Sequence, residues 1–374
     1  MPGLYLHIPF CKQACNYCDF HFSTTHNTKS AMLEAMRKDI CLRSDYLGTN
    51  QLNTIYFGGG TPSLLTGDEL KGIFETIHRN FSVDPDAEIT LEANPDDITA
   101  ERLDEFRIAG INRLSIGIQS FSDEDLKYLN RVHSAQQAID AVKLAQAHGF
   151  NNISIDLIYG IPTLSEEQWE QNMETAFSLN VNHLSCYSLT VEPRTALAKL
   201  IKDRKVTEVD DEMSAIHFAM LMDRASWAGY EHYEISNFAK PGHYSRHNTS
   251  YWNGEPYLGI GPSAHSYNKV SRQWNISNNP QYIRSIDESI VPFEREELTD
   301  TEKFNEYILT SLRTIWGISL RKLFLEFGEK SAMEFQRNII PLLDDEQIEL
   351  QGENLVLTRR GKFFADRIAA DLFQ

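Results

Sequence analysis

The sequence predicts an α/β fold, a partial (β/α)6 barrel of the TIM type followed by a small C-terminal α+β domain that resembles a winged helix. Six short apolar segments alternate with amphipathic segments in the first half of the chain. Polar residues and glycines stand where these apolar segments end, and the alternation stops after Thr190. Serial β-then-α units favour parallel strands with right-handed crossovers, which is the basis of the prediction.

The length, composition and charge of the chain limit its function. Its 374 residues allow about two domains, and 41% apolar residues are enough for a sizeable core. The formal charge of 35 − 53 = −18 argues against nucleic acid as the main partner. No apolar stretch approaches the ~20 residues that span a bilayer, and the N-terminal residues lack the regions of a secretory signal. We therefore expect a cytoplasmic protein without a transmembrane segment.

The elements of the barrel are expected in the following order. Strands are predicted over residues 4–8, 53–57, 88–93, 113–118, 153–158 and 183–189. Helices are predicted over residues 29–43, 67–80, 99–108, 135–148 and 165–179. Thr66 is a plausible N-cap, and Gly110 and Gly149 stand where helices end.

The remainder of the chain has a different pattern. A helix is predicted over residues 210–227, with its methionines in the core, and residues 232–294 are expected to be irregular and functional. Helices are predicted near 301–315, 319–326 and 331–342, then a hairpin of 348–350 with 355–358, and a last helix from about 360. We divide the chain into a barrel with a cysteine loop (1–230), an irregular segment that completes the pocket (231–298) and a C-terminal helical and hairpin domain (299–374). The acidic charge favours partner docking over DNA binding for the last domain.

Three of the five cysteines crowd into eight residues. They are Cys11, Cys15 and Cys18. An odd count without a secretory signal is not typical of a disulfide framework, so a metal site is predicted. Three thiolates can hold a [4Fe–4S] cluster and leave one iron open to a small molecule. Cys41 and Cys186 are interpreted as buried packing residues.

A structural zinc site is the alternative for this triad. Zinc prefers four ligands in a closed tetrahedron. His7, His21 or His26 could supply the fourth ligand. The spacing of the cysteines does not by itself decide between zinc and the cluster.

The other polar residues that interrupt the predicted strands fall at their carboxyl ends. In chain order they are Gly58–Gly60, Glu92, Gln119, Asp156, Tyr187 and Thr190. These ends meet at one face of a (β/α) barrel, where ligands bind. Three consecutive glycines allow a close backbone approach to a ligand. A buried Glu92 or Asp156 must meet a cation or hydroxyl groups such as those of a ribose, and an internal salt bridge with Arg113 or Arg131 is the alternative.

Several motifs together resemble one known family. They are Tyr5-Leu-His-Ile-Pro-Phe-Cys11-x3-Cys15-x2-Cys18, Phe57-Gly-Gly-Gly-Thr-Pro62, Glu92-Ala-Asn-Pro95, Arg113-Leu-Ser-Ile-Gly-Ile-Gln119, Asn130-Arg131 and Asp156-Leu-Ile-Tyr-Gly160. The pattern resembles the radical S-adenosylmethionine (SAM) superfamily, in the branch of oxygen-independent coproporphyrinogen III oxidases and HemW-type heme chaperones. The resemblance covers essentially the whole chain and implies a barrel of the radical SAM type.

The resemblance implies a [4Fe–4S] cluster on Cys11, Cys15 and Cys18, with SAM on the open iron. The residues that it implies for the SAM site are Tyr5, Gly59, Gly60, Thr61, Glu92, Gln119, Arg131 and Asp156. Arg131 suits a carboxylate and Asp156 suits ribose hydroxyls. Zinc becomes a minor alternative, because it gives no reason for the other residues at this face.

Two features separate the chaperones from the oxidases. The oxidases resemble Cys-x3-Cys-x2-Cys-x-Cys, and here Phe20 takes the last position. The segment from His247 to Trp252 matches the HNxxYW motif of the chaperones, in which the histidine is the implied heme ligand. His265 is a second candidate to face the pocket, whereas His133 and His183 are interpreted as structural.

The resemblance therefore favours a heme chaperone with a [4Fe–4S] cluster, SAM and heme as cofactors. Its implied partners are acceptor hemoproteins, membrane-bound respiratory proteins among them, with a location in the cytoplasm or at the inner face of the membrane. The protein is then no conventional enzyme, although SAM cleavage stays open. The alternative is an oxygen-independent coproporphyrinogen III oxidase, which would produce protoporphyrinogen. A zinc-stabilised adaptor is a third class.

Overall fold

Six parallel strands form the centre of the fold, and they are neighbours in chain order, as predicted. The computed structural model describes residues 2–374, so Met1, where the predicted barrel domain begins, lies outside the described residues. The strands are β1 (Gly3–Ile8), β2 (Gln51–Gly59), β3 (Ser82–Ala93), β4 (Arg113–Gln119), β5 (Ile153–Tyr159) and β6 (His183–Ser188). Their carboxyl ends meet at one face of the barrel, because all six run in the same direction.

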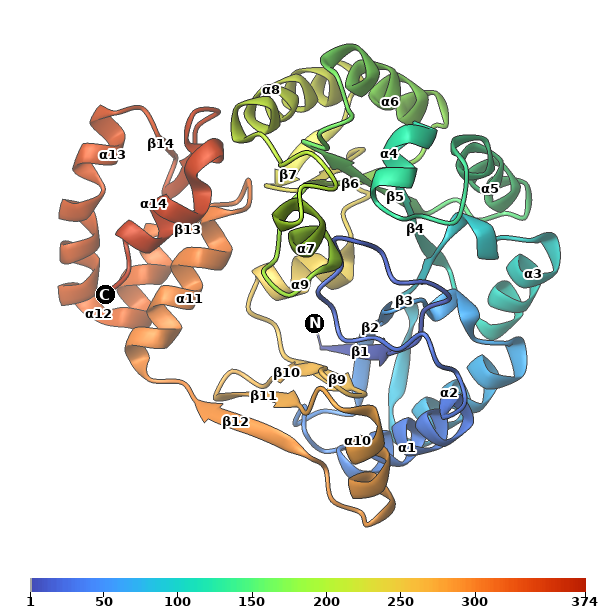
Figure 1. Cartoon of the computed structure of the whole chain (residues 1–374). Coiled ribbons are helices and arrows are strands. Elements are labelled where there is room, and N and C mark those ends of the chain that lie inside the picture. The colour runs from blue at the N-terminus through green and yellow to red at the C-terminus, as the bar shows by residue number, and fades with distance from the viewer. Residues whose placement is uncertain (1) are drawn as a thin grey trace.

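The helices that follow these strands lie on the outside of the barrel (Figure 1). They are α1 (Lys29–Leu42), α2 (Gly67–Asn80), α3 (Ala100–Ala109), α4 (Asp123–Tyr128), α5 (Ala135–Ala147) and α6 (Glu166–Ser178). The side chain of the predicted N-cap Thr66 accepts a hydrogen bond from the backbone N–H of Glu69, and the Glu69 carboxylate accepts one from the backbone N–H of Thr66. This reciprocal capping box satisfies two backbone donors at the start of α2.

The segment 231–298, which was expected to be irregular, contains short strands that extend the sheet to twelve strands. On one side, β8 (Asn237–Ala239) pairs with β6, and β7 (Glu231–Glu234) pairs with β8. On the other side, β9 (Tyr257–Ile260) pairs with β1 and leads to β10 (His265–Tyr267), β11 (Ser271–Asn275) and β12 (Phe293–Glu297). The expectation is wrong because strands this short show little periodicity, and their partners lie far away in the sequence.

Four further helices accompany these strands. They are α7 (Ala196–Lys202), α8 (Asp211–Trp227), α9 (Arg246–Trp252) and α10 (Asn279–Asp287). On α8, Met222 belongs to the core and Met220 packs against it. Met213 has intermediate exposure and is absent from that core, so the interpretation of the methionines is confirmed only in part.

The C-terminal region forms a small α+β unit with its own apolar core. Its elements are α11 (Asp300–Leu312), β13 (Ile318–Ser319), α12 (Leu320–Asn338), α13 (Ile340–Asp344), β14 (Ile348–Gln351), β15 (Asn354–Leu357) and α14 (Ala365–Asp371). The predicted hairpin of β14 and β15 is confirmed. The break predicted between the two middle helices is confirmed, since Gly328 interrupts α12 with a non-helical backbone and a positive φ of 84°.

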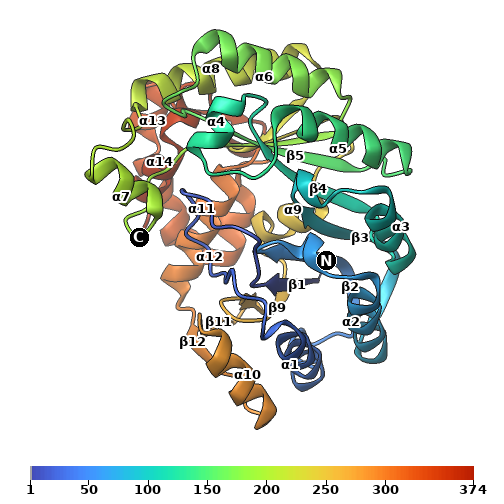
Figure 2. The ribbon, with the colours of Figure 1, turned by 45° about the vertical axis from the view of Figure 1, so that its right-hand side comes forward.

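The C-terminal unit packs beside α8, away from α3 and α5 (Figures 1 and 2). The ring of Phe363 meets that of Phe218 edge-on at 5.2 Å, and Arg359 forms an ion pair with Asp223. The Nζ atom of Lys362 lies 3.1 Å from Nδ1 of His232. Within residues 2–374, the structure has no helix with the length and apolar character that crossing a membrane requires.

Candidate functional site

The carboxyl ends of the strands surround a cavity of about 490 Å³. Ten of the twelve predicted site residues line it: Cys11, Cys15, Cys18, Gly59, Gly60, Thr61, Glu92, Gln119, Arg131 and Asp156. We call this cavity the rim pocket. The structure thus brings together residues from five strands or the loops after them, as the common direction of the strands requires.

The cysteine loop is fixed by hydrogen bonds on both sides of the triad. The backbone N–H of Cys11 donates to the carbonyl of Ser23 at 3.0 Å. Asn16 donates through its side chain to the carbonyl of Tyr128 at 2.8 Å, and Asn130 donates to the carbonyl of Ala14 at 2.7 Å. The loop therefore has a defined conformation against the segment after β4.

The donor set of the rim pocket suits an iron–sulfur cluster better than a single zinc ion. All three cysteines are free thiols, and no group of three Cys, His, Asp or Glu side chains in residues 2–374 is close enough to hold one metal ion. Tetrahedral zinc needs its ligands within about 2.0–2.3 Å of one point, whereas a cluster spreads its ligands over several irons. Burial raises the pKa of Cys18 to about 12, and coordination would deprotonate such a thiol.

Two of the glycines after β2 are required by close contacts. A Cβ atom on Gly59, which has a φ of 103°, would lie 2.6–2.9 Å from the ring of His7. A Cβ atom on Gly60 would lie 2.7 Å from the carbonyl oxygens of Ile8 and Phe10. Only glycine fits here, and the backbone facing the rim pocket stays uncovered.

Glu92 and Asp156 do not form the internal salt bridges that were the alternative. Glu92 accepts a hydrogen bond from the Tyr56 hydroxyl at 2.8 Å, and Asp156 accepts one from Ser115 at 3.3 Å. Arg113 instead lies 3.8 Å from Glu88. Burial raises the pKa of Glu92 to about 7 and that of Asp156 to about 6. Both carboxyl groups are therefore available to donors from a ligand.

Arg131 crosses the rim pocket and keeps a donor without a partner. One terminal nitrogen donates to Asn94 and to the carbonyl of Gly117, each at 2.7 Å, and the other lies 3.3 Å from the Cys15 sulfur. Its Nε atom is buried without a hydrogen-bond partner. A buried donor in this state favours an anionic ligand group. The neighbouring Gln119 has a φ of 71°, which is unusual for a residue other than glycine.

The last two predicted residues, Tyr5 and His247, lie below the rim pocket. They belong to a packed group beside the middle of β1 and β2 that we call the floor cluster: Tyr5, Thr54, Tyr56, His247 and Tyr251. His247 is 1% exposed. Its Nδ1 lies 2.8 Å from the hydroxyl of Thr54 and its Nε2 lies 2.7 Å from that of Tyr251. Both ring nitrogens therefore have partners in this conformation.

Sequence reasoning missed three residues that position His247. Thr54 bonds its ring, the Tyr56 ring stacks on it at 5.0 Å, and Glu88 accepts the backbone N–H of His247 at 2.9 Å. A signal was available, because alternate residues of a strand share a face. Thr54, Tyr56 and Gly58 alternate in β2, as do Glu88, Thr90 and Glu92 in β3, and Thr54 pairs with Glu88.

The other candidate residues have simpler positions. His265 is exposed on β10 and stacks on Trp274 at 6.2 Å. His183 is fully buried, and its two ring nitrogens meet Ser154 and Tyr233. Cys186 is buried as expected, but Cys41 is exposed, so that interpretation of Cys41 is wrong. Cys41 lies on the outward face of an amphipathic helix, a position that its helical pattern alone does not settle.

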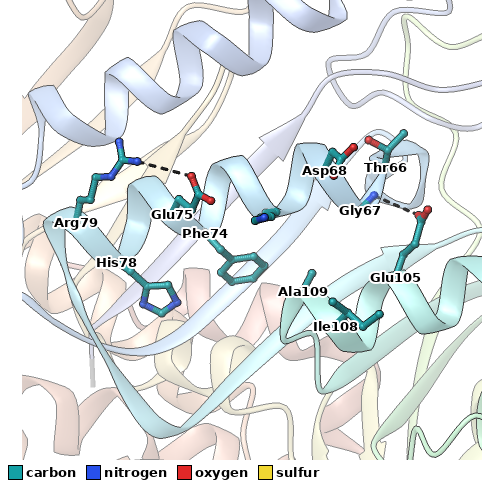
Figure 3. Close-up of a pocket in the computed structure, with 11 residues that line it drawn as sticks. Thr66, Gly67, Asp68, Phe74, Glu75, His78, Arg79, Glu105, Ile108 and Ala109 are labelled. Carbon is teal, nitrogen blue, oxygen red and sulfur yellow. Dashed lines mark hydrogen bonds and ion pairs between the residues drawn. The ribbon is translucent and has the colours of Figure 1, made fainter.

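A larger groove lies on the outer surface between α2 and α3, and Figure 3 shows its lining. Its volume is about 840 Å³, and Phe74 and Ala109 line it beside Ile108, which is 88% exposed. Glu105 accepts the backbone N–H of Gly67 at 3.2 Å across one end. None of the predicted site residues lines this groove, so the rim pocket remains the candidate site.

Two family models match separate parts of the chain. The Radical SAM superfamily model matches residues 5–176, and the HemN C-terminal domain model matches residues 298–364. A protein of Mycobacterium tuberculosis named heme chaperone HemW is 35% identical over 99% of this chain and 94% of its own length. The chain belongs to the HemW family within the radical SAM superfamily. The predicted resemblance is confirmed.

Further relatives agree with this assignment. The heme chaperone HemW of Bacillus subtilis is 34% identical over 98% of both chains. The crystal structure of coproporphyrinogen III oxidase (HemN) from Escherichia coli matches with a TM-score of 0.86, covering 100% of this chain and 90% of that one at 24% identity. This second match concerns the fold, and it confirms the predicted radical SAM barrel with a small C-terminal domain.

Proposed function

We propose that this chain is a heme chaperone that binds a [4Fe–4S] cluster, SAM and heme, and delivers the heme to acceptor hemoproteins. The observation that supports this most directly is full-length identity of 34–35% to proteins named heme chaperones. The HNxxYW motif at His247–Trp252 is in keeping with it. The acceptors proposed are hemoproteins, including membrane-bound respiratory proteins, reached from the cytoplasm or the inner face of the membrane.

The residues of the rim pocket are proposed to hold the cluster and SAM. Cys11, Cys15 and Cys18 would ligate three irons, and the open iron with its SAM would supply one-electron chemistry at the sulfonium when bound. Arg131 would hold the SAM carboxylate and Asp156 the ribose hydroxyls. The remaining proposed SAM contacts are Tyr5, Gly59, Gly60, Thr61, Glu92 and Gln119. Of these, Tyr5 does not line the cavity and would act from below it.

His247 is proposed as the heme ligand, but only after the floor cluster rearranges. Heme iron needs a free imidazole nitrogen, and both nitrogens of His247 have hydroxyl partners. Burial lowers the pKa of His247 to about 3, so the ring is neutral and needs no deprotonation before ligation. Release from Tyr251 would free Nε2 while Thr54 keeps Nδ1 in place.

A heme titration of the full chain tests the proposal. The His247→Ala variant should lose most of the affinity and change the heme absorption spectrum, since it removes the ligand. The exposed His265→Ala variant is the matched control and should bind heme normally. If His247→Ala binds heme with unchanged affinity and spectrum, the ligand assignment is wrong.

An oxygen-independent coproporphyrinogen III oxidase is the second candidate, because the fold matches 90% of that enzyme's chain. Phe20 lines the mouth of the rim pocket, where the oxidase pattern has cysteine, and is 67% exposed. Incubation with coproporphyrinogen III, SAM and reductant distinguishes the two functions. Formation of protoporphyrinogen and carbon dioxide would establish the oxidase.

The division into residues 1–230, 231–298 and 299–374 is also a proposal. Its support is the separate apolar core of the last region, which includes Phe304, Leu323 and Phe335. Limited proteolysis near residue 299 tests it, because cleavage at a domain boundary should leave a resistant barrel fragment.

A further inference from the structure

Tyr56 touches both the rim pocket and the floor cluster. Its hydroxyl donates a hydrogen bond of 2.8 Å to Oε1 of Glu92, which lines the rim pocket. Its ring stacks on that of His247, with centroids 5.0 Å apart and planes inclined by 25°. One rigid aromatic side chain therefore links a carboxylate of the proposed SAM site to the proposed heme ligand.

The surroundings of Tyr56 leave its ring little freedom. The ring of Tyr5 also stacks on it, with centroids 6.1 Å apart. A Cβ atom on Gly58 would lie 2.9 Å from Tyr5, 3.0 Å from Tyr56 and 3.1 Å from Glu92, so these three side chains converge on a glycine. A shift of Glu92 in so dense an interior must move the ring of Tyr56 as well.

Ligation of heme by His247 would require a second state, and this contact can bias the choice between the two. In the observed state, Thr54 and Tyr251 occupy its ring nitrogens and Tyr56 covers its face. In the state that binds heme, one nitrogen is free. A ligand in the rim pocket that donates to Glu92 would draw this carboxylate towards it, and the Tyr56 hydroxyl bound to Oε1 would have to follow or lose its bond, which weakens one of the contacts that hold the observed state.

We infer that Tyr56 is a positioning residue that couples occupation of the rim pocket by SAM to the release of His247 for heme. This inference rests on the proposed function and adds the route by which its two ligands communicate. Coupling between two binding sites is reciprocal, so heme must change the affinity for SAM by the same factor by which SAM changes the affinity for heme.

The test is a heme titration of the reconstituted full chain, with and without saturating SAM. In the unchanged chain, SAM should raise the heme affinity by about 5-fold or more, as typical coupling energies allow. Tyr56→Phe keeps the ring and removes only the hydroxyl, so it should bind heme while the effect of SAM falls to a factor of about 1. SAM affinity, measured with and without heme, gives an independent check on reciprocity.

Tyr251→Phe is the contrasting variant, because Tyr251 contacts His247 but its hydroxyl bonds Nε2 rather than Glu92. It should change the heme affinity by one factor, the same with and without SAM. The inference is overturned if Tyr56→Phe keeps the full effect of SAM, if Tyr251→Phe abolishes that effect instead, or if SAM has no effect on the unchanged chain. Absence of heme binding by the unchanged chain would overturn the proposed function itself.

Discussion

The rim pocket and the floor cluster are in contact through Tyr56 and Glu92, and they are prepared for ligands to different degrees. The rim pocket has a cavity of about 490 Å³, and the Nε atom of Arg131 in it has no partner. In the floor cluster, His247 is 1% exposed and both its ring nitrogens have partners. On the proposed assignments, a cluster and SAM would enter a site that already exists, whereas heme would require a conformational change.

The largest expected effect is the loss of the iron–sulfur cluster, which concerns the rim pocket alone. Replacing Cys11, Cys15 or Cys18 by serine should abolish the cluster, because three thiolates hold it and each is needed. Iron content and visible absorption after anaerobic reconstitution measure this loss. The exposed Cys41→Ser variant is the control and should keep its iron. Retention of a full cluster by any triad variant would contradict the assignment.

The next effect concerns the support of the floor cluster. Glu88 accepts the backbone N–H groups of Arg246 and His247 at 3.0 Å and 2.9 Å, and it lies 3.8 Å from the buried Arg113. Glu88→Ala should destabilise the fold by about 3–5 kcal/mol, because it leaves that cation without its carboxylate. Urea unfolding measures the change. Glu88→Gln also removes the charge but keeps one acceptor for the backbone N–H groups, so it should cost only slightly less, and a loss far smaller than that of Glu88→Ala would argue against the charge as the cause.

In the metal-free chain, the pH dependence of the free energy of unfolding should reveal the titration of the Glu92 carboxyl group. Burial raises the pKa of Glu92 from its ordinary value of 4.5 to about 7, so the folded state holds this proton more tightly than the unfolded state. The contribution of Glu92 is complete below pH 4.5 and is lost as the pH rises through 7. Glu92→Gln should therefore gain up to about 3 kcal/mol over the unchanged chain at pH 8.

Thermal unfolding at pH 5 and pH 8 checks this prediction. Burial raises the pKa of Asp156 to about 6, and the variant keeps this carboxyl group. The free energy of unfolding of the variant should therefore still fall as the pH rises through about 6. The same variant should bind SAM less well, since it loses a charge that faces the rim pocket. If the variant and the unchanged chain differ in thermal stability by the same amount at pH 5 and at pH 8, the assignment to Glu92 is wrong.

The smallest effect tests how tightly the two regions are joined. Gly58→Ala should destabilise the fold by about 1–3 kcal/mol, because its Cβ atom would press on Tyr5, Tyr56 and Glu92 at about 3 Å. Gly72→Ala within α2 meets only the flexible end of Arg37 and should gain about 0.5–1 kcal/mol. Thermal unfolding compares them. If both substitutions increase stability, the side chains between the rim pocket and the floor cluster can rearrange to accommodate a methyl group at Gly58.

Much of the fold and of the rim pocket could be predicted from the sequence. Helix α2 was placed at its observed bounds, because its N-cap and its apolar period are local properties. Ten site residues were brought together because strands of one direction end at one face. The short strands β7 to β12 could not be found, since their hydrogen bonds depend on partners elsewhere in the chain.

The sequence by itself determined the direction and order of β1 to β6, the cysteine triad and the polar strand ends, because each depends on spacing along one short segment. Only the tertiary structure decided that Arg113 pairs with Glu88 rather than with Glu92 or Asp156. It also decided that His247 lies buried against the ring of Tyr56. Such pairings depend on which side chains meet across the barrel interior. The physical reason is that packing and hydrogen bonding there join residues far apart in the sequence, such as Thr54 and His247, which are separated by 193 positions.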